Sequence, residues 1–208
     1  MTRRLLLAPL LVAGLLLPAP AQAAVWTGTD DTGDVVGTTY DPEPPPCGTM
    51  TRHDGSARTH GDLVRVRVRH GRDRLRITTR YADLRPGRAL TVAHEVRTPG
   101  RDFVAGVMTS PGRRPSTWWY DAAAESTDSC GITSGGIMGG DLTCPNLRES
   151  VSFRRDRVRL TVPRDCLEAP RWVRVDAFAG HEADTIWYGD RWGEPGGRWS
   201  PRLRAWRP

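Results

Sequence analysis

Closely spaced arginines are the first residues in the sequence that could do chemistry together. Seven of the nineteen residues from Leu63 to Tyr81 are arginine, and most of them alternate with aliphatic residues. A guanidinium group can form two parallel hydrogen bonds with a phosphate or a carboxylate. The pattern therefore predicts a basic platform for a cell-wall glycan or another anionic envelope polymer. The candidate binding residues are Arg65, Arg67, Arg69, Arg74 and Arg76.

The same arginines have a second interpretation, in which they pair with acids inside the domain. Neighbouring strands could supply Glu95, Asp102 and Asp156 while the arginine stems cover the sheet. The full chain has 30 basic and 24 acidic residues, so removal of a predicted leader with two arginines leaves +4. Such a small net charge favours internal pairing for most of the arginines. A structural or protein-interaction domain is the function that this interpretation predicts.

Adjacent aromatic residues form a further candidate surface. Trp118, Trp119 and Tyr120 follow one another, and adjacent residues of a strand point to opposite faces of a sheet. One of the two tryptophans should therefore lie outward or at a sheet edge, where its ring could stack on a sugar. We expect these residues and the arginines to form one binding platform. The alternative is that the tryptophans fill a wide core.

Two acidic loops could bind a hard cation. The first contains Asp30, Asp31 and Asp34 among glycines that allow backbone carbonyls to turn inward. Calcium takes six to eight oxygen ligands from loops of this kind. The second loop contains the four acids Asp176, Glu182, Asp184 and Asp190. We expect calcium, if it binds, to have a structural role, although acids are also common in turns without a metal.

No arrangement of residues in the sequence supports catalysis. Ser134 lies among glycines, but the nucleophile motif of an α/β-hydrolase does not surround it. The segment that begins at His181 lacks the second histidine of a zinc metalloprotease helix. We predict a protein without catalytic residues and without a cofactor beyond structural calcium. The remaining alternative is a secreted hydrolase built from His181, Asp176 and Asp184.

The elements that must position these groups are β-strands. With residues 70–73 as a turn, Val66 and Val68 face the same way as Leu75 and Ile77, and the arginines face outward. Val68 should then pair with Leu75. Like charges that meet across strands cost a few tenths of a kcal/mol to about 1 kcal/mol, so the outer face needs acids or a ligand.

A second hairpin spans residues 149–167 and predicts a disulfide. With a turn at residues 154–157, Val151 pairs with Leu160, and Cys144 lies within one position of Cys166 on the opposite strand. We expect a bridge between Cys144 and Cys166, which leaves Cys47 to pair with Cys130. A bridge between Cys130 and Cys144 is the rival.

The remaining alternating segments complete an all-β fold. Further strands are expected at residues 34–40, 89–97, 102–109, 116–120, 171–178 and 184–188. Nine or ten strands in two packed antiparallel sheets bury their apolar faces most simply. We predict one β-sandwich domain over residues 24–208, with little helix.

The first 23 residues have the features of a secretory signal peptide. Two arginines precede an apolar run that ends in a small-residue cleavage site at Ala23. The run is too short to span a bilayer, so we expect an extracellular protein without a membrane span. Four cysteines fit an oxidising compartment. We expect no nucleic-acid partner, because the chain is exported and has no recognition motif.

The order of several motifs resembles a known group of proteins. "DDTGDV", "RYADL", "TVPRDCL" and "RWVRVDAF" are similar to segments of small secreted β-sandwich proteins of actinobacteria. More distantly, the strand pattern resembles the DOMON and family 9 carbohydrate-binding sandwiches, which implies a sugar, haem or metal ligand. The methionine and histidine pair of a haem site is missing. We therefore expect a noncatalytic binding or accessory module at the cell envelope.

Overall fold

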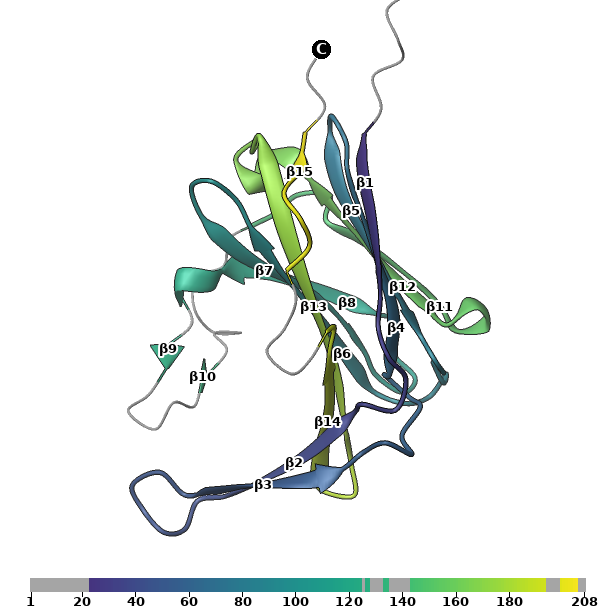
Figure 1. Ribbon diagram of the computed structural model, residues 1–208, viewed down its shortest axis with the longest axis vertical. Coiled ribbons are helices and arrows are strands. Elements are labelled where there is room, and N and C mark those ends of the chain that lie inside the picture. The colour runs from purple at the N-terminus through teal and green to yellow at the C-terminus, as the bar shows by residue number, and fades with distance from the viewer. Residues whose placement is uncertain (1–22, 125, 128–132, 135–142, 194–198, 206–208) are drawn as a thin grey trace, which may run out of the picture.

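The computed structural model describes residues 23–124, 126–127, 133–134, 143–193 and 199–205. Within these ranges the chain forms two packed antiparallel sheets, and its helical segments are short 3-10 turns (Figure 1). The predicted β-sandwich is therefore confirmed. No helix among these residues is long and apolar enough to cross a membrane. The predicted signal peptide comprises residues 1–23, and its first 22 positions lie outside the described residues.

The smaller, five-stranded sheet contains the arginine-rich segments. Its strand order is β1-β4-β5-β12-β11. The bounds are Ala24–Thr29 for β1, Leu63–His70 for β4, Arg74–Tyr81 for β5, Arg157–Pro163 for β12 and Arg148–Ser152 for β11. Because β5 pairs with β12, the two hairpins expected from the sequence lie side by side in one sheet.

The larger sheet has eight strands in the order β3-β2-β14-β13-β6-β7-β8, with β15 paired to β13. The bounds are Val36–Asp41 for β2, Thr49–Asp54 for β3, Leu90–Arg97 for β6, Asp102–Thr109 for β7, Ser116–Asp121 for β8, Trp172–Ala183 for β13, Ile186–Arg191 for β14 and Leu203–Arg204 for β15. The β2–β3 hairpin extends from the sandwich at the end opposite β15 (Figure 1). Residues 41–48 are the end of β2 and the turn of this hairpin.

Short elements complete the described chain. Strand β9 (Ser126–Thr127) pairs with β10 (Thr133–Ser134). The 3-10 turns are η1 (Ala122–Ala124), η2 (Phe153–Arg155) and η3 (Arg164–Leu167). The described residues form more strands than the nine or ten expected. Strands β1 and β3 were not expected, because their sequences have no long alternating pattern.

The β4–β5 hairpin shows which part of its geometry the alternation determines. Val66 and Val68 are buried and the arginines between them are exposed, so the predicted faces are correct. The predicted pairing is wrong, because Val68 pairs with Ile77. Gly71 donates a backbone hydrogen bond to the carbonyl of Arg74 over 3.0 Å, so the turn is shorter than expected. The resulting shift of two positions keeps every side chain on its predicted face.

The β11–β12 hairpin is also shifted by two positions, because its turn lies one residue earlier than expected. Val151 pairs with Val158 rather than with Leu160. Asp156 closes the turn in the left-handed conformation, and its carboxylate accepts a hydrogen bond from the backbone of Leu84.

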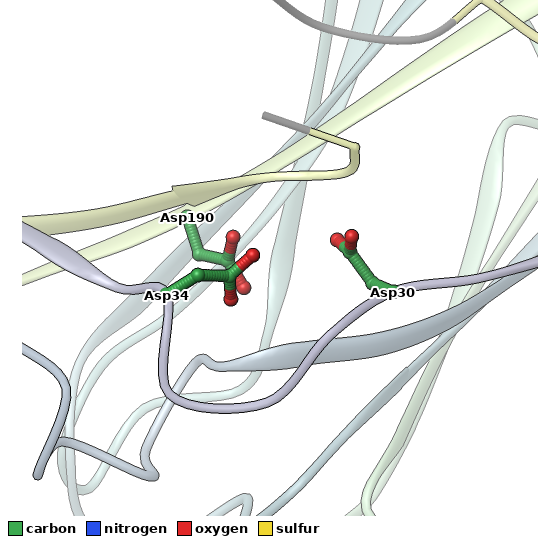
Figure 2. A group of neighbouring side chains, drawn as sticks. All are labelled: Asp30, Asp34 and Asp190. Atoms are coloured by element: carbon green, nitrogen blue, oxygen red, sulfur yellow. The ribbon is translucent and has the colours of Figure 1, made fainter. Parts of the chain in front are cut away.

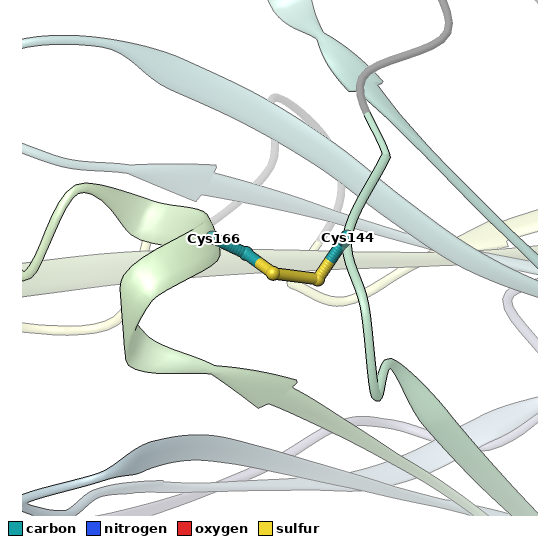
Figure 3. Close-up of a disulfide and its surroundings, with 2 residues drawn as sticks. All are labelled: Cys144 and Cys166. Atoms are coloured by element: carbon teal, nitrogen blue, oxygen red, sulfur yellow. A yellow bond between two sulfur atoms is a disulfide. The ribbon is translucent and has the colours of Figure 1, made fainter.

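A disulfide joins the open ends of this hairpin. Cys144 precedes β11, and Cys166 lies in η3 directly after β12 (Figure 3). Their Cα atoms are 5.5 Å apart, within the range that a bridge requires. The predicted bridge is therefore confirmed, and the rival pairing of Cys144 with Cys130 is wrong. Cys47 also forms a disulfide, whereas its predicted partner Cys130 lies outside the described residues.

The core lies between the two sheets. Leu75, Ile77 and Leu160 from the smaller sheet meet Phe103 and Val175 from the larger one, and all are almost fully buried. Because side chains alternate along each strand, the outward residues of the two sheets lie on opposite sides of the molecule.

Candidate functional site

Nine arginines lie on the outward side of the five-stranded sheet. We call this set the arginine face. Its members are Arg65, Arg67, Arg69, Arg74, Arg76, Arg80, Arg148, Arg157 and Arg159.

The strand register arranges the arginine face in rows across the sheet. One row contains Arg65, Arg80 and Arg157, which are cross-strand neighbours on β4, β5 and β12. The next contains Arg67 and Arg159 on either side of Thr78. A third contains Arg69, Arg76 and Arg148, with Thr161 between the last two.

The other outward positions of this sheet carry no charge. They are occupied by Val25, Thr27 and Thr29 of β1, Thr78 of β5, Thr161 and Pro163 of β12, and Ser150 and Ser152 of β11. No outward strand position of this sheet therefore holds an acidic residue.

Two of the acids expected to neutralise the arginines, Glu95 and Asp102, lie on the larger sheet, so that part of the expectation is wrong. The third, Asp156, lies in the turn before Arg157, where its carboxylate accepts a hydrogen bond from the backbone of Leu84. Asp102 pairs with Arg97, and Glu95 pairs with Arg191, all four on the larger sheet. None of the nine arginines forms an ion pair with a carboxylate of the described residues. The face is thus a concentrated positive surface.

Crowding of like charges is strongest near the middle of the arginine face. Desolvation lowers the pKa of Arg159, and repulsion by Arg157, Arg76 and Arg155 adds to this effect. The Nε atoms of Arg76, Arg157 and Arg159 are buried and have no hydrogen-bond partner in the described part of the chain. A hollow of about 270 Å³ lies at the β4–β5 turn, where Arg69, Arg74 and Arg76 line it together with Asp73.

The predicted aromatic platform does not join the arginine face. Trp118 and Tyr120 stack on each other on the outward side of the larger sheet, with ring centroids 5.5 Å apart. Trp119 points the other way, into the core, where it stacks on Phe103. Because the tryptophans and the arginines belong to different sheets, the structure separates the two halves of the expected site.

A second cluster of like charge lies where β1 passes to β2. Asp30, Asp34 and Asp190 each place a carboxylate oxygen within 4.8 Å of the others (Figure 2). We call these three residues the acid cluster. Asp31, the third predicted calcium ligand, is exposed and is not a member. The cluster thus combines one residue of the second acidic loop with two of the first.

Burial makes the carboxylates of the acid cluster harder to ionise. Desolvation raises the pKa of Asp190 to about 8, with a contribution from the charges of Asp34, Asp30 and Asp62. Desolvation likewise raises the pKa of Asp30 to about 6. The neighbouring Asp62 is 1% exposed and accepts a hydrogen bond from the backbone of Gly33 over 3.0 Å.

The other acids of the second loop do not reach this cluster. Asp176 accepts a hydrogen bond from Arg191 over 2.8 Å, and Asp184 pairs with Arg58 over 3.4 Å. His181 is buried and its ring packs against His60. His181 and Asp176 are five positions apart in one strand and therefore point to opposite faces. The structure does not bring His181, Asp176 and Asp184 together into the hydrolase site that was the remaining alternative.

Sequence reasoning missed two features of these sites. Arg148 completes the third row of the arginine face, and it could have been found by extending the second hairpin by one residue pair. Asp190 and Asp62 meet the loop at residues 30–34 only through tertiary packing. No spacing in the sequence indicates that contact.

Comparisons do not assign this chain to a family. No protein-family model matches the sequence, and neither a curated protein nor a solved structure matches the chain.

Proposed function

We propose that this protein is a noncatalytic binding module of the cell envelope that holds an anionic polymer on its arginine face. The observation that carries this proposal is the array of nine arginines without an acidic residue at any outward strand position of the sheet. The predicted signal peptide and the disulfide between Cys144 and Cys166 support an extracellular setting.

An array of this kind is unfavourable for the folded protein alone. Arg65 faces Arg80, which faces Arg157, and Arg69 faces Arg76. Each pair of opposed like charges in a sheet costs up to about 1 kcal/mol. A bound polyanion would reverse the sign of this energy, because each arginine would then face phosphate or carboxylate groups.

The spacing of the arginines indicates an extended ligand. Outward residues of one strand repeat about every 7 Å, and neighbouring strands lie about 4.8 Å apart. Three rows on β4, β5 and β12 thus offer cations over a broad, nearly flat area rather than in one pocket. A chain with regularly repeated anionic groups, such as an acidic glycan or a phosphate-bearing wall polymer, can contact several of them at once.

Binding to purified cell walls and to two soluble polymers, polygalacturonate and long-chain polyphosphate, tests this proposal. We expect the wild-type protein to be retained at low salt and released at high salt. At high salt, cations from solution bind the polymer again and displace the arginines. Arg67→Gln, Arg76→Gln and Arg159→Gln together should weaken binding at least about tenfold and reduce its salt dependence.

The matched control removes three arginines that have acidic partners. Arg58→Gln, Arg97→Gln and Arg101→Gln change the net charge by the same amount, but these residues form ion pairs away from the arginine face. This variant should bind nearly as tightly as the wild type. Absence of retention at low salt, or equal losses in both triple variants, would show that the arginine face is not the binding site.

A further inference from the structure

The acid cluster brings negative charge from both sheets to one place. Asp30 directly follows β1 of the five-stranded sheet, whereas Asp34 precedes β2 and Asp190 lies in β14, both in the larger sheet. The carboxylates of Asp34 and Asp190 lie side by side, and that of Asp30 faces them (Figure 2). Two segments far apart in the sequence, the loop between β1 and β2 and strand β14, therefore present oxygen atoms to a common point.

No positive side chain of the described residues pairs with these carboxyl groups. Asp30, Asp34 and Asp190 form no ion pair in the described part of the chain, and neither does Asp62. Asp190 is only 3% exposed. A buried carboxylate without a counterion is strongly unfavourable.

Each carboxylate also has an oxygen that no group of the described residues binds. One oxygen of Asp190 accepts the backbone N–H of Leu63, and one of Asp30 accepts that of Gly193. The second oxygen of each is buried without a hydrogen-bond partner among the described residues, as is Oδ1 of Asp34. The protein thus orients these side chains through one oxygen and leaves the other available to a ligand.

We propose that Asp30, Asp34 and Asp190 bind one calcium ion that joins the two sheets of the sandwich. Oxygen ligands at about 2.3–2.6 Å from a calcium ion lie at most about 5 Å from one another. The carboxylate oxygens of the acid cluster all lie within 4.8 Å of one another, which satisfies this limit. Three carboxylates also match the preference of calcium for charged oxygen ligands.

Asp62 has a positioning role in this site. It accepts a hydrogen bond from Gly33, which lies in the loop between two of the ligands. Its own carboxylate lies near enough to raise the pKa of Asp190. It therefore holds the loop in place and adds to the field that attracts a cation.

Thermal unfolding and calorimetry of the protein without its predicted leader test the calcium site. After treatment with chelator, calcium at about one hundred times its dissociation constant should raise Tm by about 5–10 °C. Calorimetry should show one binding site per chain. Magnesium should give a much smaller shift, because it requires a more regular geometry and retains its waters.

Two substitutions and a matched control locate the ion. Asp190→Asn and Asp34→Asn keep the size of the side chain but remove a charged ligand, so each should abolish most of the calcium-dependent shift in Tm. Asp31→Asn removes the same charge from an exposed residue of the same loop and should leave the shift unchanged. The unfolding midpoint in chelator verifies that each variant folds.

Several results would overturn the proposal. These are an unchanged Tm together with no calorimetric binding at millimolar calcium, an equal response to magnesium, or the same loss in Asp31→Asn as in Asp190→Asn. Polymer binding by the arginine face is measured separately in chelator, since the acid cluster contributes no residue to that face. Failure of one proposal therefore leaves the other to be decided by its own experiment.

Discussion

At the scale of single residues, the molecule contains ionisable groups in settings that disfavour their charge. Arg159 is crowded by other arginines, and Asp190 is buried beside other acids. His94 is 1% exposed on the inward side of β6, between Ala105 and Ala177 on the neighbouring strands. Burial lowers the pKa of His94 to about 4. His94 alternates with Leu90 and Val92, which are buried on the same side of β6.

His94 should make the folded protein sensitive to acid. Its folded pKa of about 4 lies below the ordinary value of 6.5, so the unfolded chain takes up the proton first as the pH falls. The stability it supports is complete above pH 6.5 and is lost toward pH 4, which amounts to about 3 kcal/mol.

Urea unfolding of wild type and His94→Leu between pH 7.5 and 4 measures this effect. As the pH falls, the free energy of unfolding of the wild type should decrease relative to that of His94→Leu. Other groups titrate equally in both proteins and cancel in this difference. A difference that is constant with pH would contradict the assignment.

At the scale of strands, alternation predicted faces well and pairings poorly. Val66 and Arg67 point to their expected sides because the period of two is a property of any strand. The pairing of Val68 depends on the backbone of the turn, and an error of two residues leaves every face unchanged. The acid cluster could not be predicted, because the approach of Asp190 to Asp30 results from packing between segments 160 residues apart in the sequence.

A negative charge introduced at the centre of the arginine face should separate stability from binding. Thr78 lies between Arg67 on β4 and Arg159 on β12. Thr78→Glu places an acid between two cations, so it should raise the free energy of unfolding by about 0.5–1 kcal/mol. The same acid should weaken polymer binding several-fold.

The control for this substitution is Thr78→Gln, which adds the same bulk without the charge. Its polymer affinity should remain close to that of the wild type. Chemical unfolding and binding to polyphosphate supply the two measurements. A Thr78→Glu protein that is less stable yet binds normally would contradict the view that the arginines repel one another and recruit anions.

At the scale of the whole molecule, the sandwich separates its functional candidates. The arginine face covers one side, the stacked Trp118 and Tyr120 lie on the other, and the acid cluster lies where segments of the two sheets meet. The disulfide between Cys144 and Cys166 acts on the same scale, since it restricts the unfolded chain as well as the edge strand β11.

Removal of this disulfide should lower global stability. The two cysteines are 22 residues apart in sequence, and closure of such a loop contributes about 3 kcal/mol in the chain-entropy model. Urea unfolding of a Cys144→Ala and Cys166→Ala double variant should show this loss. Hydrogen exchange should be fastest in β11, which forms the edge beside the bridge. An unchanged unfolding midpoint would show that packing alone holds this end of the sheet.

The one-sided distribution of arginine has a consequence for orientation. Along β4 the guanidinium groups repeat at every second residue, whereas across the strands two of the three rows are interrupted by threonine. A bound fibre would therefore meet one spacing of arginines along the strands and another across them. This difference would align the protein in a preferred direction on the fibre. Molecules adsorbed to such a fibre would then share a common orientation, with the larger sheet turned away from it.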